Sequence, residues 1–219
     1  MPDQPRAVDD HDSRDRRDAA YPKLSLDDIV DLRAYERTRD ELRSRVIGLK
    51  RVRRVQLGPI ISVLFENRET VRFQVQEMAR AERMMSDAQI QGELDAYNPL
   101  VPNRGELSAS LFLEMTSAED LKRWLPRLVG IERSIELVIG EEGHASHVVS
   151  RPEAGHAAAL TREDTTASVH YIKFEIGEGL IDAFAAGPVA LASAHREYRA
   201  VTPLGDDTRS SLLLDLRGS

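Results

Sequence analysis

Apolar residues recur with two different periods along this chain, and the change falls near residue 102. Before it, apolar residues recur every three or four positions, as in amphipathic helices. After it, they mostly alternate with polar residues, as in half-buried strands. We therefore expect an α+β fold, in which an N-terminal helical section (23–102) packs on a mainly antiparallel sheet with two short helices (103–219). The connection between the sections is short and apolar, which favours one domain over two tightly packed halves.

The first helix is indicated by a stripe of apolar residues between Leu26 and Leu49. Ser25 precedes the stripe and two aspartates follow it in the first turn, where they meet the positive end of the helix dipole. The pattern predicts a long helix that begins at Ser25 and ends between Gly48 and Arg54.

The stretch from Pro59 to Pro102 has the clearest boundaries in the chain. Residues 59–67 predict a largely buried strand, and Asn67 can cap a helix that continues to residue 85. A hairpin over 68–76 is the alternative, because apolar residues there also alternate. We favour the helix, since the alternation stops while the helical spacing continues. A capping box at 86–89 then begins a second helix, which ends at Asn98-Pro99.

The second section contains a strand–helix–strand pattern twice. A capping box at 116–119 and a glycine at position 130 bound the first of its helices. We expect a loop over 151–165, with a short helical turn at 156–160. The predicted strands are 107–115, 135–139, 144–150, 169–176 and 189–194, and the predicted helices are 116–130, 179–186 and 207–216.

Composition excludes several classes of function. The 219-residue chain contains no cysteine, which excludes disulfides, thiol nucleophiles and cysteine-ligated zinc or iron–sulfur sites. The net charge of −7 argues against nonspecific nucleic-acid binding.

Apolar runs fall short of the ~20 residues that cross a bilayer, and the N-terminus lacks a secretory core, so we expect a cytoplasmic protein. Residues 1–22 hold six Asp and four Arg and predict a disordered tail.

Several stretches resemble an uncharacterised bacterial family, domain of unknown function 3501. The matching segments are LSLDDIVDLRAYERTRDELR, FENRETVRFQVQEMARAERM, ELDAYNPLVP, LPRLVGIE and SVHYIKFEI. The resemblance covers roughly residues 24–216. It carries no established activity. Genes of this family are often found beside rubrerythrin-like and iron–sulfur proteins, which implies a redox or iron-linked setting and a partner of that kind.

The sequence contains no Walker loop, dinucleotide fingerprint, nucleophile elbow or HExxH motif. An arginine row on the helix after Asn67 can clamp a carboxylate or phosphate, although exposed ion pairs are the more common outcome. His170 falls on the apolar face of its strand, where a hydrogen-bonded core histidine is favoured over a general base or ligand. The candidate binding residues are Arg72, Gln76, Glu77, Arg80, Arg83, Asn98 and His170.

Two further groups of charged or metal-binding residue types carry less information. Residues 50–54 contain four cations, for which a solvated helix end is favoured over a nucleic-acid site. His144 and His147 would point to opposite faces of a strand. We therefore expect no metal site and no other cofactor.

Two functions fit these observations. The favoured one is a non-enzymatic accessory protein that docks onto a redox or iron–sulfur protein through charged helices. The alternative is a small-molecule (anion) binding protein or enzyme that uses the arginine row with His170. A nucleic-acid role ranks third. A deep cavity would favour a binding protein, and a flat charged face would favour a docking protein.

Overall fold

The computed structural model describes residues 22–155, 160 and 164–218. The predicted tail, apart from Pro22, and most of the predicted turn at 156–160 lie outside the described residues.

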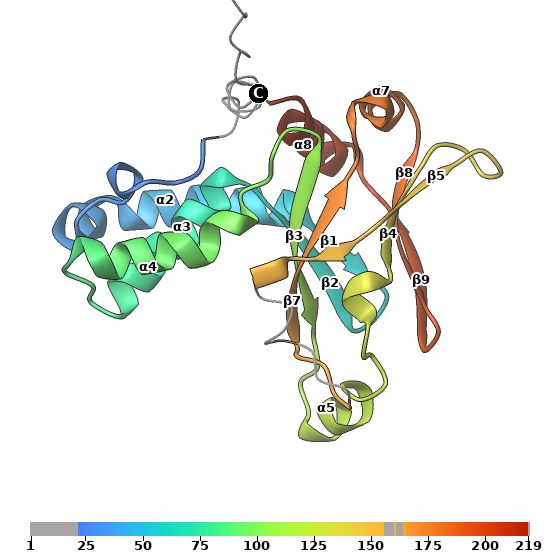
Figure 1. The fold of residues 1–219 in the computed structure, drawn as a ribbon, viewed down its shortest axis with the longest axis horizontal. Coiled ribbons are helices and arrows are strands. Elements are labelled where there is room, and N and C mark those ends of the chain that lie inside the picture. The colour runs from blue at the N-terminus through green and yellow to red at the C-terminus, as the bar shows by residue number, and fades with distance from the viewer. Residues whose placement is uncertain (1–21, 156–159, 161–163, 219) are drawn as a thin grey trace, which may run out of the picture.

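Two antiparallel sheets pack face to face (Figure 1). Side chains that alternate along the strands meet between the sheets and form one continuous apolar core, which includes Phe65 and Phe174. The first sheet has the order β1 (Arg54–Leu57), β2 (Ile61–Glu66), β3 (Glu106–Leu113), β7 (Val169–Glu175) and β6 (Arg151–Pro152). The second has the order β5 (Ser146–Val149), β4 (Ile135–Ile139), β8 (Val189–His195) and β9 (Tyr198–Pro203).

The α+β class is confirmed, but the predicted single sheet is two sheets. Strands β1, β6 and β9 were not predicted, because each is short or carries few apolar residues. The two sheets meet along the edges β1 and β9, where the Thr202 hydroxyl donates to the Gln56 carbonyl at 2.8 Å and the Tyr198 hydroxyl donates to the Leu57 carbonyl at 2.7 Å. Tertiary contacts therefore stabilise strands that have weak local signals.

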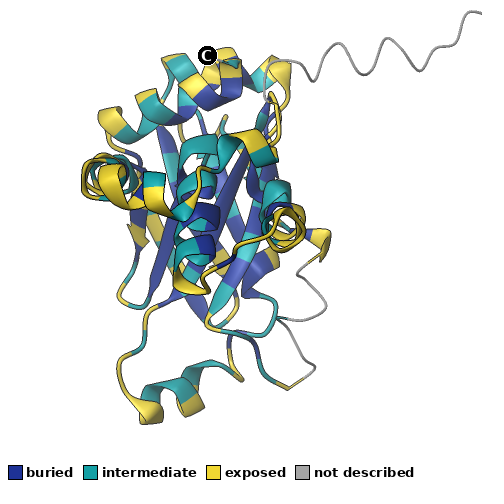
Figure 2. Ribbon diagram, turned by 90° about the vertical axis from the view of Figure 1, so that its left-hand side faces the viewer, coloured by how far each residue is buried: buried dark blue, intermediate teal, exposed yellow. Residues whose placement is uncertain are grey.

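The helical section covers the outer face of the five-stranded sheet, as predicted (Figures 1 and 2). It consists of α2 (Leu32–Arg53), α3 (Arg68–Ala81), α4 (Asp87–Tyr97) and the 3-10 turn η3 (Asn98–Leu100). The helix at 68–81 replaces the alternative hairpin. The Asn67 side chain caps it by accepting the Thr70 N–H at 3.0 Å, and the Thr70 hydroxyl accepts the Asn67 N–H at 2.9 Å.

The helix predicted from Ser25 is interrupted. Ser25 caps only a short 3-10 turn, η2 (Leu26–Asp28), and α2 begins after Asp31, whose carboxylate accepts the Ala34 N–H at 2.9 Å. Between them the backbone of Ile29 is extended, and the Gln76 side chain binds both the N–H (3.0 Å) and the C=O (2.9 Å) of Val30. A tertiary hydrogen-bond pair therefore replaces the helical one at this point.

The remaining helices lie at the ends of the sandwich (Figure 1). The short helices α5 (Ala118–Trp124) and α7 (Glu178–Ala186) lie at opposite ends of it. The capping residue of α5 is Ser117, one position after the predicted start. Helix α8 (Asp206–Arg217) docks through Leu212 and Leu216, while η4 (Ile131–Arg133) precedes β4. Within the described part of the chain, every helix is too short or too polar to span a membrane.

Candidate functional site

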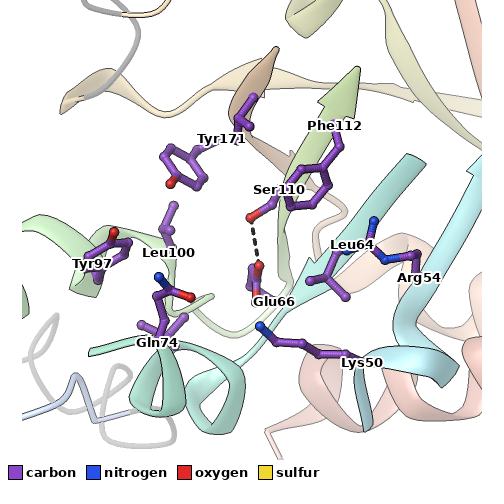
Figure 3. Close-up of a pocket in the computed structure, with 12 residues that line it drawn as sticks. Lys50, Arg54, Leu64, Glu66, Gln74, Tyr97, Leu100, Ser110, Phe112 and Tyr171 are labelled. Carbon is purple, nitrogen blue, oxygen red and sulfur yellow. Dashed lines mark hydrogen bonds between the residues drawn. The ribbon is translucent and has the colours of Figure 1, made fainter. Parts of the chain in front are cut away.

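A cavity of about 260 Å³ lies between the helical section and the outer face of the five-stranded sheet (Figure 3). Strands β2, β3 and β7 form its floor, and α3 with the C-terminal ends of α2 and α4 forms its walls. We call it the helix–sheet cavity. Its apolar lining consists of Leu64, Val71, Leu100, Phe112 and Val169.

Strand alternation directs polar side chains into this cavity. In β3 and β7, Ser110 and Tyr171 stand opposite each other in the register, and both line the cavity. Their neighbours Leu111 and His170 face the other sheet, because successive side chains of a strand point to opposite sides. The helix-facing side of the sheet is thus buried but partly polar.

Glu66, the last residue of β2, is 8% exposed. Its Oε1 accepts a hydrogen bond from the Ser110 hydroxyl at 2.7 Å (Figure 3). Its Oε2 accepts one from the Thr70 hydroxyl at 2.5 Å. The nearby Arg53 guanidinium donates to the main-chain carbonyl of Glu66 at 3.1 Å. Two hydroxyls from different elements therefore orient this buried carboxylate, and the arginine beside it binds the backbone instead.

Two cationic side chains line the cavity. Arg54 is committed to protein partners: it donates to Ser62 at 2.7 Å and Glu114 at 3.0 Å and stacks 4.7 Å above the Phe112 ring. Lys50 lies 5.8 Å from the Phe73 ring, and no carboxylate of the described residues is within ion-pair distance of its ammonium. In Figure 3 the Lys50 side chain extends toward Glu66. Lys50 thus offers a charge that the fold itself does not neutralise.

Two tyrosines and a glutamine complete the polar lining. Burial raises the pKa of Tyr171, and the nearby Tyr97 and Glu66 raise it further, so its hydroxyl stays protonated at neutral pH. The Tyr97 hydroxyl and the Gln74 amide have no hydrogen-bond partner among the residues that the structure describes. Together with Lys50, these groups can contact a guest molecule through charge and hydrogen bonds.

The seven residues predicted as candidates lie outside this cavity. In the arginine row, Arg80 donates to Glu36 at 2.6 Å, while Arg72 lines an open groove at the start of α3. Arg83 is exposed just beyond the helix, with a left-handed φ of 53°. The row therefore does not converge on one point.

Three of the candidates hold the helical section together. The Glu77 carboxylate accepts hydrogen bonds from Arg39 at 2.8 Å and from the Tyr35 hydroxyl at 2.6 Å, which joins α3 to α2. Gln76 binds the backbone of Val30, as described above. Asn98 binds the backbone of Leu24 in the same way, at 2.7 Å and 2.8 Å. Their hydrogen-bonding capacity is largely used within the protein.

His170 is 2% exposed and faces the core between the sheets. Its Nε2 lies 2.8 Å from the Thr166 hydroxyl and 3.0 Å from the Ala167 carbonyl. Burial lowers the pKa of His170, which keeps the imidazole neutral at pH 7. Because it points away from α3, the structure does not bring His170 together with the arginine row.

The prediction that the basic cluster at 50–54 is a solvated helix end is correct only in part, because Arg51 and Arg54 are exposed but Arg53 is not. Arg53 is 1% exposed and forms an ion pair with Asp215 of α8. His147 of the second sheet pairs with Glu136 at 2.8 Å. Over the described ranges of the chain, no three His, Asp or Glu side chains gather in a way that could hold a metal ion.

The Glu77 network makes stability depend on pH. Hydrogen bonds from Arg39 lower the pKa of Glu77 to about 2, against the opposing effect of burial. A carboxyl with a lowered folded-state pKa stabilises the protein above its unfolded-state pKa, and this contribution is lost as pH falls toward 2. Glu77 is 25% exposed, so solvent screens its interactions and reduces the contribution that the pKa shift alone would give. We therefore expect about 2 kcal/mol of the free energy of unfolding to be lost between pH 5 and 2.

Urea denaturation at several pH values checks this expectation. Glu77→Gln should flatten the acid part of the profile, whereas Glu41→Gln, at an exposed position on α2, should leave it unchanged. A profile of Glu77→Gln that keeps the slope of the original protein would contradict the assignment.

Sequence reasoning missed the residues of the helix–sheet cavity because they are distant along the chain. In the sequence, Lys50 and Arg54 stand out only as part of a basic run. One signal for Glu66 was available in the sequence. Its carboxylate directly follows the five residues of a buried strand, and a carboxylate inside such a strand is unusual because Glu side chains are normally exposed. No spacing in the sequence connects it with Lys50 or Tyr171.

Comparisons with known proteins place the chain among related sequences. The family model described as "Protein of unknown function (DUF3501)" matches residues 23–216. A crystal structure of a novel protein of unknown function from Burkholderia pseudomallei K96243 is 32% identical, with a TM-score of 0.80, and the match covers 89% of this chain and all of that one. None of the curated proteins matches the chain. Since the family model spans nearly all the described residues, this chain belongs to the DUF3501 family.

Proposed function

We propose that this protein binds a small anionic molecule in the helix–sheet cavity. The observation that carries the proposal is Lys50, an ammonium group at a concave site with no carboxylate partner among the described residues. A partly buried cation without a counter-ion attracts an anion more strongly than an exposed one, because water screens it less.

The lining also suits a small organic body. Phe112, Leu100 and three aliphatic residues offer apolar contact, while Tyr97 and Gln74 offer hydrogen bonds. Binding sites commonly combine a mostly apolar lining with a few polar groups that fix orientation. At about 260 Å³, the cavity accommodates a metabolite rather than a large cofactor.

Replacement of Lys50 tests the proposal. We expect benzoate, 3-phenylpropanoate or phenyl phosphate to raise the melting temperature of the protein. Lys50→Met should weaken this binding by about tenfold or more, because a charged hydrogen bond is lost. Titration calorimetry measures the affinity directly.

Arg51→Met is the matched control for this experiment. Arg51 is exposed, adjacent in sequence and absent from the cavity lining, so its loss removes the same charge without touching the site. The proposal fails if none of these anions binds, or if Lys50→Met and Arg51→Met bind them equally well.

Docking onto a redox or iron–sulfur protein stays a prediction from the family resemblance. Several charges of the helical section are already paired within the protein, as in Arg39–Glu77, Arg80–Glu36 and Arg68–Asp28. These pairs leave fewer charges for a partner, so the cavity is the better-supported site. Affinity purification from the native cell tests the docking function, which fails if redox proteins never co-purify.

A further inference from the structure

We infer that the ligand of the helix–sheet cavity is an amino acid, with its carboxylate at Lys50 and its ammonium group at Glu66. This inference rests on the proposed function and specifies the class of ligand. It follows from two opposite charges that line one cavity and form no ion pair with any residue that the structure describes.

The Glu66 carboxylate lacks a cationic partner within the described part of the chain. Both arginines near it are engaged elsewhere: Arg53 binds its main-chain carbonyl at 3.1 Å, and Arg54 binds Glu114 at 3.0 Å. Ser110 and Thr70 supply only neutral donors. A buried carboxylate is normally paired with a cation, so the cation expected here is one that arrives with the ligand.

Glu66 also has free capacity to accept hydrogen bonds. An ionised carboxylate has about four acceptor positions, two on each oxygen. One position on each oxygen is used, by Ser110 on Oε1 and by Thr70 on Oε2. These bonds hold the carboxylate in one orientation while leaving positions for an ammonium group, which is the preorganised arrangement that favours binding.

Lys50 and Glu66 do not neutralise each other. They line the same cavity, with Lys50 reaching it from α2 and Glu66 from the sheet, yet no ion pair joins them. A ligand with one charge would satisfy one of them and leave the other desolvated without a partner. A ligand with both charges satisfies both, and the aromatic and aliphatic walls contact its carbon skeleton.

The test compares ligands that share a body and differ in charge. The first series is L-phenylalanine, 3-phenylpropanoate and 2-phenylethylamine. The second, with a greater distance between the charges, is 4-(aminomethyl)benzoate, 4-methylbenzoate and 4-methylbenzylamine. Titration calorimetry on the full chain should show, in at least one series, that the zwitterion binds about tenfold or more tightly than both singly charged relatives.

Two variants assign the charges. Glu66→Gln keeps the size of the side chain and should make the zwitterion and the matching carboxylate bind alike. Lys50→Met should weaken both of them, and Arg51→Met should change neither. Circular dichroism verifies that each variant is folded. If a variant does not fold, the preference of the original protein for the zwitterion still tests the inference.

Specific outcomes would overturn the inference. Equal binding of the zwitterion and the carboxylate to the original protein contradicts it, and so does a preference that persists in Glu66→Gln. If either outcome is found but 3-phenylpropanoate still binds in a way that depends on Lys50, the proposed anion-binding function remains supported. Absence of binding by all six compounds contradicts the amino-acid assignment, while binding of phenyl phosphate would preserve the proposed function.

Discussion

Arg53→Met is expected to lower the free energy of unfolding by about 4 kcal/mol. The guanidinium is 1% exposed and joins three elements. It donates to the carbonyls of Phe65 at 2.8 Å and Glu66 at 3.1 Å, to the Ser211 hydroxyl at 2.9 Å, and to the Asp215 carboxylate. Methionine fills similar space but donates no hydrogen bond, so the buried Asp215 carboxylate and two main-chain carbonyls lose the guanidinium as a donor.

The pH dependence of this variant is a second signature. Burial raises the pKa of Asp215, and Arg53 opposes that rise. Without Arg53 the folded-state pKa rises further above the unfolded value, so the ionised carboxylate destabilises the fold. The carboxyl is protonated in both folded proteins at low pH, so the deficit should be smallest there and should grow as pH rises above the folded-state pKa that Asp215 has beside Arg53.

Chemical denaturation of a small set of variants checks both statements. Arg51→Met is the control, because Arg51 is exposed on the same helix, and it should change stability by less than about 0.5 kcal/mol. Arg53→Met with Asp215→Leu should recover part of the loss, since the uncompensated charge is gone. A loss in Arg53→Met no greater than in Arg51→Met would show that the buried pair does not stabilise this junction.

Gly58→Ala is expected to lower the free energy of unfolding by about 3 kcal/mol. Gly58 turns the chain between β1 and β2 with a φ of +67°, which strains any residue with a Cβ. An added Cβ would lie 2.4 Å from the Tyr198 hydroxyl. That hydroxyl donates to the Leu57 carbonyl at 2.7 Å and accepts the Ile60 N–H at 3.3 Å, so moving it breaks two of the hydrogen bonds that connect the two sheets.

A double-mutant cycle separates the steric clash from the backbone strain. On a Tyr198→Phe background the clashing oxygen is absent, so Gly58→Ala should cost only about 1 kcal/mol there. Gly92→Ala is the matched control, because Gly92 lies in α4 with open space around it, and it should be neutral or slightly stabilising. Equal effects of Gly58→Ala on both backgrounds would exclude the clash with Tyr198.

The hydrogen bonds of Arg53 to β2 and α8 also help to position the helix–sheet cavity. Arg53 donates a hydrogen bond to the main-chain carbonyl of Glu66, and the side chain of Glu66 is the carboxylate that lines the cavity. Asn67, which follows it, caps α3 and also hydrogen-bonds Asp215. Helix α8 is thereby connected, through buried polar contacts, to the floor and to one wall of the site.

Helix starts in this chain were predictable because their signals are local. Asn67 and Ser86 cap α3 and α4 through side-chain bonds to residues three positions away, so a few letters of sequence contain the whole interaction. The start of α2 was wrong for the opposite reason. Ser25 is a genuine cap, yet the break at Val30 depends on Gln76, which is distant in sequence.

The sequence by itself determined the α+β class, the order of most elements and the apolar faces that pack together, because period and capping act over a few residues. Only the tertiary structure decided that the strands form two sheets, that Arg53 is buried, and that Lys50 and Glu66 line one cavity. These features depend on the pairing register of strands far apart along the chain. The register selects which side of each strand faces the helices, and a shift by one residue would reverse that choice.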